Sequence, residues 1–261
     1  MTDSGNRRIE EYALNGWPAL RTLLLDGWLL RFAEGYTKRS NSINPIYKEI
    51  KLTRDICGMI DYCEEQYAKA ALNTTFKITP FAPADLDHIL EAGGYAKVEP
   101  SHVKILDDFG SLKLPDLTEI KIGERITNKW LDVLAELNSL SEKNKAVTYQ
   151  LLSGSHLKQG YFILYKYSIP VACGLGVIED NYVGLYDIVT SLGHRNQGYG
   201  EQLILHILNW AKINGADKSY LLVLQNNAAA NSLYNKIGYK ERYTYWYRVK
   251  VPDTHSSETV L

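Results

Sequence analysis

Cysteine is scarce in this chain of 261 residues, and the few cysteines present exclude two kinds of site. They are too few and too irregularly placed for a disulfide framework, and none stands at the short intervals of a metal-ligand set. We therefore expect reduced thiols in a cytoplasmic protein, and no bound metal. The three cysteines are Cys57, Cys63 and Cys173.

Long apolar runs and an excess of charge of one sign are also missing. Arg21, Asp26 and Arg31 interrupt the most apolar stretch, residues 20–33, which excludes a membrane span there. The amino terminus has no apolar core, so we expect no signal peptide. The 29 basic and 30 acidic residues nearly cancel, whereas a nucleic-acid-binding face shows as a basic excess. We expect neither nucleic acid nor a membrane as a partner, and the oligomeric state stays open.

The hydrophobic periodicity of the first half predicts an α/β domain. The expected elements are a helix over residues 9–25 divided at Pro18, a strand at 27–33, a polar loop at 36–47, a helix at 53–71, a strand at 75–79, a helix at 84–92 and a strand at 95–106. Residues 107–115 lack periodicity and carry glycine and proline. We therefore predict a domain boundary there, with domains over residues 1–112 and 113–261.

The second half alternates strands and helices more regularly. The expected strands are 119–122, 160–165, 171–178, 182–190, 220–224 and 239–251, and the expected helices are 128–137, 146–152, 198–213 and 227–236. Residues beyond Pro252 are expected to be disordered.

One motif carries chemistry: Arg195-Asn196-Gln197-Gly198-Tyr199-Gly200, between a predicted strand and a predicted helix. Glycine lets a ligand approach the backbone, because no side chain intervenes. The amides of such a turn and the positive end of the helix dipole bind phosphate groups. A plain strand-to-helix turn has the same local pattern, so the neighbouring sequence has to decide. Neither a Walker loop nor the G-x-G-x-x-G dinucleotide pattern is present.

The sequence around this loop resembles the GNAT superfamily of acyl-CoA-dependent N-acyltransferases. The family pattern is a strand, Arg/Gln-x-x-Gly-x-Gly/Ala, a helix, a strand, then Asn-x-x-Ala-x-x-x-Tyr and Gly-Phe/Tyr. Here Asn227, Ala230, Tyr234 and Gly238-Tyr239 follow at matching spacing, and the resemblance covers residues 171–251. It implies an α/β protein of GNAT fold, a mixed twisted sheet flanked by helices, preceded by a second, smaller α/β domain.

The resemblance also implies acetyl-CoA as co-substrate and assigns its site. It implies that the pyrophosphate is held by the backbone amides of Gln197, Gly198, Tyr199 and Gly200. Arg195 and Asn196 would line the same loop. It implies that a splayed strand pairs with the pantetheine arm through Ile188, Val189 and Thr190. The Val189 amide would also polarise the thioester carbonyl. Asn227 would contact the cofactor, and Tyr234 would protonate the departing thiolate. The alternative for Tyr234 is a helix tyrosine packed on the sheet.

The general base is where the sequence departs from the family. Histone-acetylating members keep a glutamate eleven residues before the loop, and that position is Gly184 here. Asp187 lies close, but strict alternation along a strand predicts that it points to the opposite face. Glu201 suits the first turn of a helix for structural reasons. The base stays open: a water relay and a group from the other domain are the alternatives.

Residues 53–106 repeat the order helix, strand, helix, Gly-Tyr, strand of the second half. When Gly94-Tyr95 is aligned with Gly238-Tyr239, Leu90 stands where Tyr234 stands. No glycine precedes residue 53 over residues 43–52, so the first half resembles a degenerate GNAT-like domain without a cofactor site. An unrelated α/β cap is the alternative.

A polar segment of this half is a further candidate. We predict that its side chains help to hold the substrate, and the alternative is a solvated loop; the candidates are Arg31, Arg39 and Asn41.

The predicted function is transfer of an acetyl group from acetyl-CoA to a primary amine of a small molecule, amino acid or peptide. The predicted mechanism is direct attack, because no cysteine is placed as a nucleophile. Two alternatives stay open: a non-catalytic CoA-binding regulatory module, and a transferase for a longer acyl group.

Overall fold

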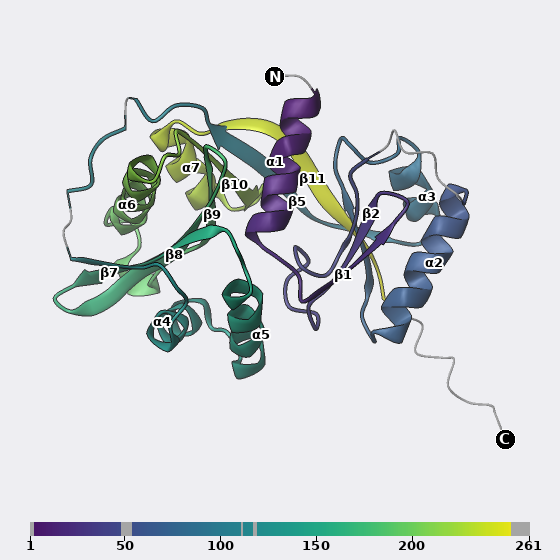
Figure 1. Cartoon of the computed structure of the whole chain (residues 1–261), viewed down its shortest axis with the longest axis horizontal. Helices are drawn as coiled ribbons and strands as arrows, with labels where there is room; N and C mark the ends of the chain where they lie inside the picture. Colours follow the sequence, from purple (N-terminus) through teal and green to yellow (C-terminus); the bar gives the residue numbers. More distant parts are fainter. Residues whose placement is uncertain (1–2, 48–53, 111, 117–118, 252–261) are drawn as a thin grey trace. The chain divides into compact units, whose positions relative to one another are not determined.

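The computed structural model describes residues 3–47, 54–110, 112–116 and 119–251. Its contacts divide the α/β chain into two compact units (Figure 1). The first unit combines Met1–Pro18 with Ser101–Tyr243, and the second combines Ala19–Pro100 with Thr244–Leu261. The carboxy-terminal tail predicted to be disordered lies outside the described residues.

The first unit is a mixed sheet between helices. Its strands follow the order β5-β10-β9-β8-β7-β6 and are antiparallel except for the parallel pair β9 and β10. The strands are β5 (Ala96–Leu106), β6 (Ile120–Gly123), β7 (Lys158–Lys166), β8 (Ile169–Glu179), β9 (Tyr182–Thr190) and β10 (Lys218–Leu224). The helices are α1 (Asp3–Gly16), α4 (Asn128–Asn138), α5 (Glu142–Ser153), α6 (Tyr199–Ile213) and α7 (Ala228–Ile237).

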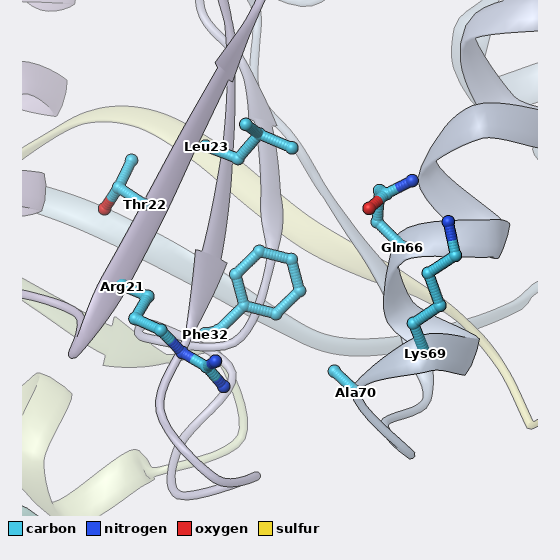
Figure 2. Close-up of a pocket in the computed structure, with 7 residues that line it drawn as sticks. All are labelled: Arg21, Thr22, Leu23, Phe32, Gln66, Lys69 and Ala70. Carbon is cyan, nitrogen blue, oxygen red and sulfur yellow. The ribbon is translucent and has the colours of Figure 1, made fainter.

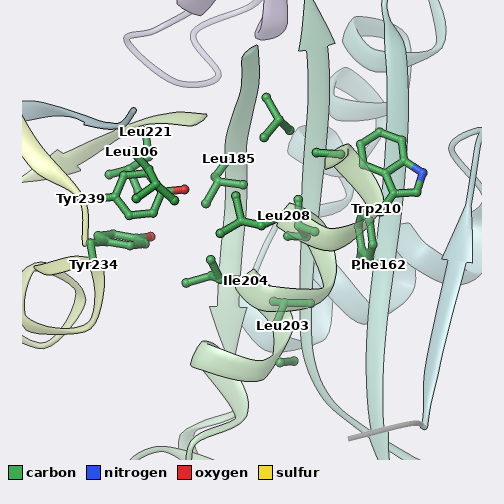
Figure 3. Close-up of a cluster of buried hydrophobic side chains, with 14 of the residues drawn as sticks. Leu106, Phe162, Leu185, Leu203, Ile204, Leu208, Trp210, Leu221, Tyr234 and Tyr239 are labelled. Carbon is green, nitrogen blue, oxygen red and sulfur yellow. The ribbon is translucent and has the colours of Figure 1, made fainter. Parts of the chain in front are cut away.

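Helix α6 packs closely on one face of this sheet, because glycines of β8 leave room for it. A Cβ atom at Gly176 would stand 2.7 Å from Cγ2 of Ile207, and one at Gly174 would stand 3.3 Å from the Cδ1 atom of Ile207. Leu203 and Leu185 are buried in the same core (Figure 3). Burial of such side chains stabilises each by roughly 1.5–3 kcal/mol.

The second unit has the strand order β1-β2-β3-β4-β11. Its elements are β1 (Arg21–Leu25), β2 (Trp28–Phe32), β3 (Ile43–Pro45), α2 (Ile56–Lys69), β4 (Thr74–Ile78), α3 (Leu86–Ala92) and the end of β11 (Lys240–Lys250). Its core joins Trp28, Leu30 and Phe76 of the sheet to Met59 and Leu86 of the helices.

The structure corrects two predicted elements of the first half. Residues 21–25 form a strand, not a helix, because Asp26 and Gly27 take positive φ angles of 44° and 79° and close a two-residue hairpin onto β2. The predicted loop at 36–47 contains the short strand β3, in which Ile43 pairs with both Leu30 and Phe76.

The compact units do not coincide with a single cut between residues 112 and 113. In the first unit, residues 101–106 of β5 pair with β10. In the second unit, residues 246–250 of β11 pair with β4. Each sheet is therefore completed by a strand that belongs, along the chain, to the other half. The functional division into residues 1–112 and 113–261 stays a prediction.

Candidate active site

The glycine-containing loop folds as a left-handed turn into helix α6. Gly198 is the residue before the first helical residue, with φ of 85°, and Asn196 has φ of 58°. A Cβ atom at Gly198 would meet nothing within 4 Å, so the backbone conformation, and not crowding, favours glycine there. At Gly200 packing decides, because a Cβ atom would lie 3.3 Å from both Thr190 Oγ1 and Leu233 Cδ2.

The amides at the start of α6 are open to a ligand. The first amides of a helix have no partner within it, and glycine offers no side chain to cap them. Among the residues that the structure describes, none accepts a hydrogen bond from the amides of Gln197 to Gly200. The side chains of Arg195, Asn196 and Gln197 are exposed around them. Open amides and a positive helix end together suit a phosphate group.

Strand β9 separates from β10 beside this loop. The parallel pairing starts at Tyr182 with Lys218 and ends at Leu185 with Leu221. Beyond that point β10 continues to pair with β5, and β9 pairs with β8. The residues predicted to meet pantetheine, 188–190, thus lie on the splayed end of β9. An extended ligand can add to such a strand edge through backbone hydrogen bonds.

A bulge interrupts β9 at the start of the splay and corrects the prediction for Asp187. Tyr186 pairs with Leu175 and Val189 with Cys173, so β9 holds one extra residue. Asp187 has a φ of 48°, and a residue in a bulge does not follow strict alternation. Burial, with a contribution from the Asp187 carboxylate, raises the pKa of the Cys173 thiol. The carboxylate therefore lies near Cys173, on the β9 bulge.

Tyrosine rings occupy the place of the family's glutamate. A Cβ atom at Gly184 would stand 2.5 Å from Cζ and the hydroxyl oxygen of Tyr220. The Tyr220 hydroxyl donates to the carbonyl of Tyr12 at 2.8 Å, so Tyr186 is the donor in its 2.7 Å bond to Tyr220. Burial raises the pKa of Tyr220 well above its ordinary value. This chain of hydrogen bonds ends on a main-chain carbonyl of α1 and therefore braces that helix against the sheet.

Tyr234 projects from α7 into the core of the first unit. It is 8% exposed, and its ring centroid lies 5.8 Å from that of Tyr239. The two rings lie side by side with their hydroxyl groups directed to the same side (Figure 3). The Tyr239 hydroxyl lies 2.6 Å from Ser219 Oγ. Tyr234 thus has a packed ring, which holds its hydroxyl in a defined place.

Asn227 and Asn231 fix the start of α7. The Asn227 side chain caps the helix, accepting from the amide of Ala230 at 3.2 Å. Asn231, which the sequence analysis did not single out, donates from Nδ2 to the carbonyls of Leu224 at 2.9 Å and Asn227 at 3.0 Å. No motif marked Asn231, although an asparagine in the first turn of a helix is a common source of such bonds.

The candidates of the first half belong to a braced turn and not to a solvated loop. Asn41 accepts from the amides of Ala33 at 2.7 Å and Gly35 at 3.0 Å, and donates to the carbonyls of Tyr36 at 2.7 Å and Thr37 at 2.9 Å. Asn41 therefore braces this turn through both ends of its amide, and its predicted substrate role stays a prediction.

The two arginines of that prediction also meet in this turn. Arg31 is 4% exposed and donates from Nη1 to the carbonyl of Arg39 at 2.8 Å. A substrate role for Arg31 and Arg39 stays a prediction.

A cavity of about 330 Å³ lies in the second unit, between the β1–β2 hairpin and α2 (Figure 2). None of its lining residues belongs to the predicted site; they are Arg21, Thr22, Leu23, Phe32, Gln66, Lys69 and Ala70. Within the described ranges, His, Cys, Asp and Glu side chains do not gather in groups of three or more that could hold a metal ion. No described helix has the length and apolar character needed to cross a membrane.

The fold and the splayed strand beside a glycine loop define the class: this is a GNAT-type acetyltransferase, and the chain is an acyltransferase. It belongs to the family described as "Probable histone acetyltransferase Rv0428c C-terminal", whose sequence model matches residues 3–248. It is 29% identical over 252 residues to "Uncharacterized N-acetyltransferase YobR" of Bacillus subtilis (strain 168), covering 94% of this chain and 98% of the relative.

Solved structures share the fold. A GCN5-related N-acetyltransferase from Kribbella flavida superposes with a TM-score of 0.71 at 13% identity, over 97% of both chains. A tandem GNAT protein from the clavulanic acid biosynthesis pathway gives a TM-score of 0.56 at 12% identity, over 81% of this chain and 76% of the other.

Proposed function

We propose that this chain transfers the acetyl group of acetyl-CoA to a primary amine, with the transfer carried out by residues of the predicted domain 113–261. The observation that carries the proposal is the open amino terminus of α6 beside the splayed end of β9. The first feature suits a pyrophosphate, and the second offers a free strand edge to an extended chain such as pantetheine.

Each residue has a defined task in this proposal. The backbone amides of residues 197–200 bind the pyrophosphate, and the exposed Arg195 and Asn196 line the same loop. Residues 188–190 bind the pantetheine arm, and the Val189 amide stabilises the negative charge that develops on the thioester oxygen. Asn227 keeps α7 in place and contacts the arm from there.

Bond making and proton transfer then follow a direct route. The neutral amine attacks the thioester carbon, the carbon–sulfur bond breaks, and Tyr234 gives its proton to the departing thiolate. The nitrogen then loses its extra proton to the Tyr234 phenolate, and the amide forms. A covalent enzyme intermediate on Cys173 is disfavoured, because burial raises the pKa of this thiol and keeps it protonated.

The amine class rests on names of relatives. The family description mentions a histone acetyltransferase, and the curated relative is called an N-acetyltransferase. We therefore propose lysine-containing peptides, amino acids and small amines as acceptors to test first. The choice of acetyl over longer acyl groups is part of the same proposal.

The test measures binding and turnover separately. Calorimetry with acetyl-CoA, propionyl-CoA and free CoA reports the donor, and release of CoA thiol with a panel of amines and lysine peptides reports transfer. We expect tight acetyl-CoA binding and amine-dependent thiol release.

A second candidate is a non-catalytic CoA-binding module. The filled position at Gly184 favours it, because no carboxylate stands where the family's glutamate does. Binding of acetyl-CoA without thiol release, across the whole panel, would support this module and contradict the transferase.

A further inference from the structure

We propose that Asp187 is the general base that removes the proton from the acceptor ammonium. The proposal rests on the transferase function above and supplies the group that it lacks. An amine is a nucleophile only after it loses its extra proton, so a direct-attack enzyme needs an acceptor for that proton beside the thioester.

The bulge gives Asp187 its position. Its left-handed φ of 48° and the extra residue in β9 mark the point where strict alternation ends, since Tyr186 faces α1 and Ile188, two residues further on, faces α6. Two residues further on stands Val189, whose amide faces the thioester in the proposed function. A carboxylate on the bulge and the oxyanion donor therefore share one short segment of backbone.

The face of the sheet supports the same role. A Cβ atom at Gly174 would lie 2.6 Å from Ile188 Cδ1 and 3.3 Å from Leu203, so Ile188 and Gly174 face α6. Cys173 alternates with Gly174 and faces the other way. The Asp187 carboxylate stands at the bulge where β9 changes face and contributes to the raised pKa of the Cys173 thiol, so it lies near the Cys173 side of the sheet. The pyrophosphate binds at the start of α6, which leaves this opposite face for the amine.

Other carboxylates near β9 do not lie on its splayed end. Asp180, at the far end of the strand, accepts from the Tyr12 hydroxyl at 2.6 Å and from Arg8 at 3.1 Å. Its neighbour Glu179 accepts from Asn15 at 3.0 Å. Glu201, in the first turn of α6, pairs with Lys236. Asp187 is the carboxylate that the strand itself places at the splay.

The step balances in atoms and charge. One carboxylate oxygen of Asp187 takes a proton from the ammonium, and the freed electron pair of nitrogen forms the bond to the thioester carbon. The carbon–sulfur bond breaks, and the thiolate receives the Tyr234 proton. The Tyr234 phenolate then takes the second proton that nitrogen loses as the amide forms. The products are the acetylated amine and CoA thiol, and Asp187 releases its proton to solvent.

The variant that tests this is Asp187→Asn, because asparagine also tolerates a left-handed backbone. Turnover is measured with ethylamine and a lysine peptide, which are protonated at neutral pH, and with hydroxylamine, which is neutral. Loss of a general base lowers turnover by about 10²–10⁴-fold for protonated amines. We expect a much smaller loss with hydroxylamine and unchanged acetyl-CoA affinity. Asp180→Asn removes the same charge from the turn that leads into β9, at a residue that also has a left-handed φ of 52°, and serves as the matched control.

The outcomes separate the base from its rivals. Turnover of Asp187→Asn close to wild type overturns the inference and leaves the proposed function intact. An equal loss for protonated and neutral nucleophiles also overturns it, since that is the mark of a structural role. If the wild-type protein transfers acetyl to none of these acceptors, the proposed function fails, and the base assignment fails with it.

Discussion

The two units start equivalent helices in opposite ways. Helix α2 of the second unit is capped by Asp55, whose carboxylate accepts from the amide of Gly58 at 2.8 Å. Helix α6 of the first unit starts at Gly198, which has no side chain to offer. One unit thus fills the positive end of its helix with its own anion, and the other leaves that end open. The same order of elements can keep or lose a phosphate site through one capping residue.

The second helices of the two units, α3 and α7, end in the same way. The amide of Tyr239 donates to the carbonyl of Tyr234 at 3.0 Å, and that of Tyr95 donates to the carbonyl of Leu90 at 3.0 Å. Both tyrosines follow a glycine with positive φ. Leu90 therefore takes the backbone position of Tyr234 without its hydroxyl group. This supports the proposal that the first half is a degenerate GNAT-like copy.

We expect the largest effect, on both stability and acetyl-CoA binding, when the two halves of the chain are produced separately. Residues 113–261 alone lack the β5 strand that pairs with β10, and residues 1–112 alone lack the β11 strand that pairs with β4. We expect neither piece to show a cooperative melting transition or to bind acetyl-CoA. Co-expression of both pieces is the control and should restore both properties. A cooperative transition of 113–261 near the full-length Tm would show that the exchanged strand is dispensable.

A pair of glycine variants tests whether the open helix end is the donor site. Gly198 and Gly94 have φ of 85° and 82°, and a Cβ atom at either would meet nothing within 4 Å. Glutamate at either position therefore carries a similar left-handed strain, about 1–2 kcal/mol. We expect Gly198→Glu alone to abolish acetyl-CoA binding in calorimetry, because it adds bulk and negative charge where the pyrophosphate binds. Equal acetyl-CoA affinity in the two variants would mean that the loop is not part of the donor-binding site.

Two neighbouring tyrosines test the general acid. Tyr234→Phe removes one oxygen and keeps the packed ring, so we expect turnover to fall about 10²–10⁴-fold while acetyl-CoA affinity holds. The control is Tyr239→Phe, which loses the bond to Ser219 Oγ and should cost about 1 kcal/mol of stability without slowing turnover. Turnover, acetyl-CoA affinity by calorimetry and Tm are measured for both variants. If Tyr234→Phe turns over like wild type, Tyr234 is a packing residue.

Much of the fold followed from periodicity, and the failures have local causes. The helices at 128–138 and 199–213 and the strands of the second half were predicted within a few residues. The Asp26-Gly27 hairpin was missed because the apolar residues around it also fit a helix. The exchange of β5 and β11 could not be predicted, because strand partners depend on contacts that are remote in sequence.

For the site as well, some features could be predicted from the sequence and others could not. The loop motif predicted a glycine turn into a helix, and α6 does start directly after Gly198 with no side-chain cap; the ligand of this loop stays a prediction. The predicted direction of the Asp187 side chain was wrong, because a bulge adds a single residue to the strand and leaves no periodic signal in the sequence. The filled space at Gly184 depends on Tyr220, a residue of the neighbouring strand. Sequence near the motif could not reveal either feature.

The smallest predicted effect concerns the contact between a strand and the second helix of each unit. In the second unit, Arg248 of β11 donates to the Asp87 carboxylate at 2.7 Å. In the first unit, Lys104 of β5 donates to the neutral Asn235 at 2.8 Å. Arg248 pairs with Phe76 of β4, and Lys104 pairs with Leu221 of β10, so the two basic residues have equivalent places in the two units. Of these two contacts, the one between Arg248 and Asp87 is therefore the one whose strength depends on a titrating acid.

The sign of the pH dependence follows from Asp87. Its bond to Arg248 lowers the pKa of Asp87, so its stabilising contribution is complete above the ordinary aspartate pKa and is lost as the pH falls through the lowered value. We expect Asp87→Asn to cost about 1–2 kcal/mol near neutral pH, with a Tm difference that shrinks below about pH 4. The control Asn235→Ala should show a Tm difference that does not change over this range. A constant gap for Asp87→Asn down to pH 3 would mean that the pair stabilises through shape and not through charge.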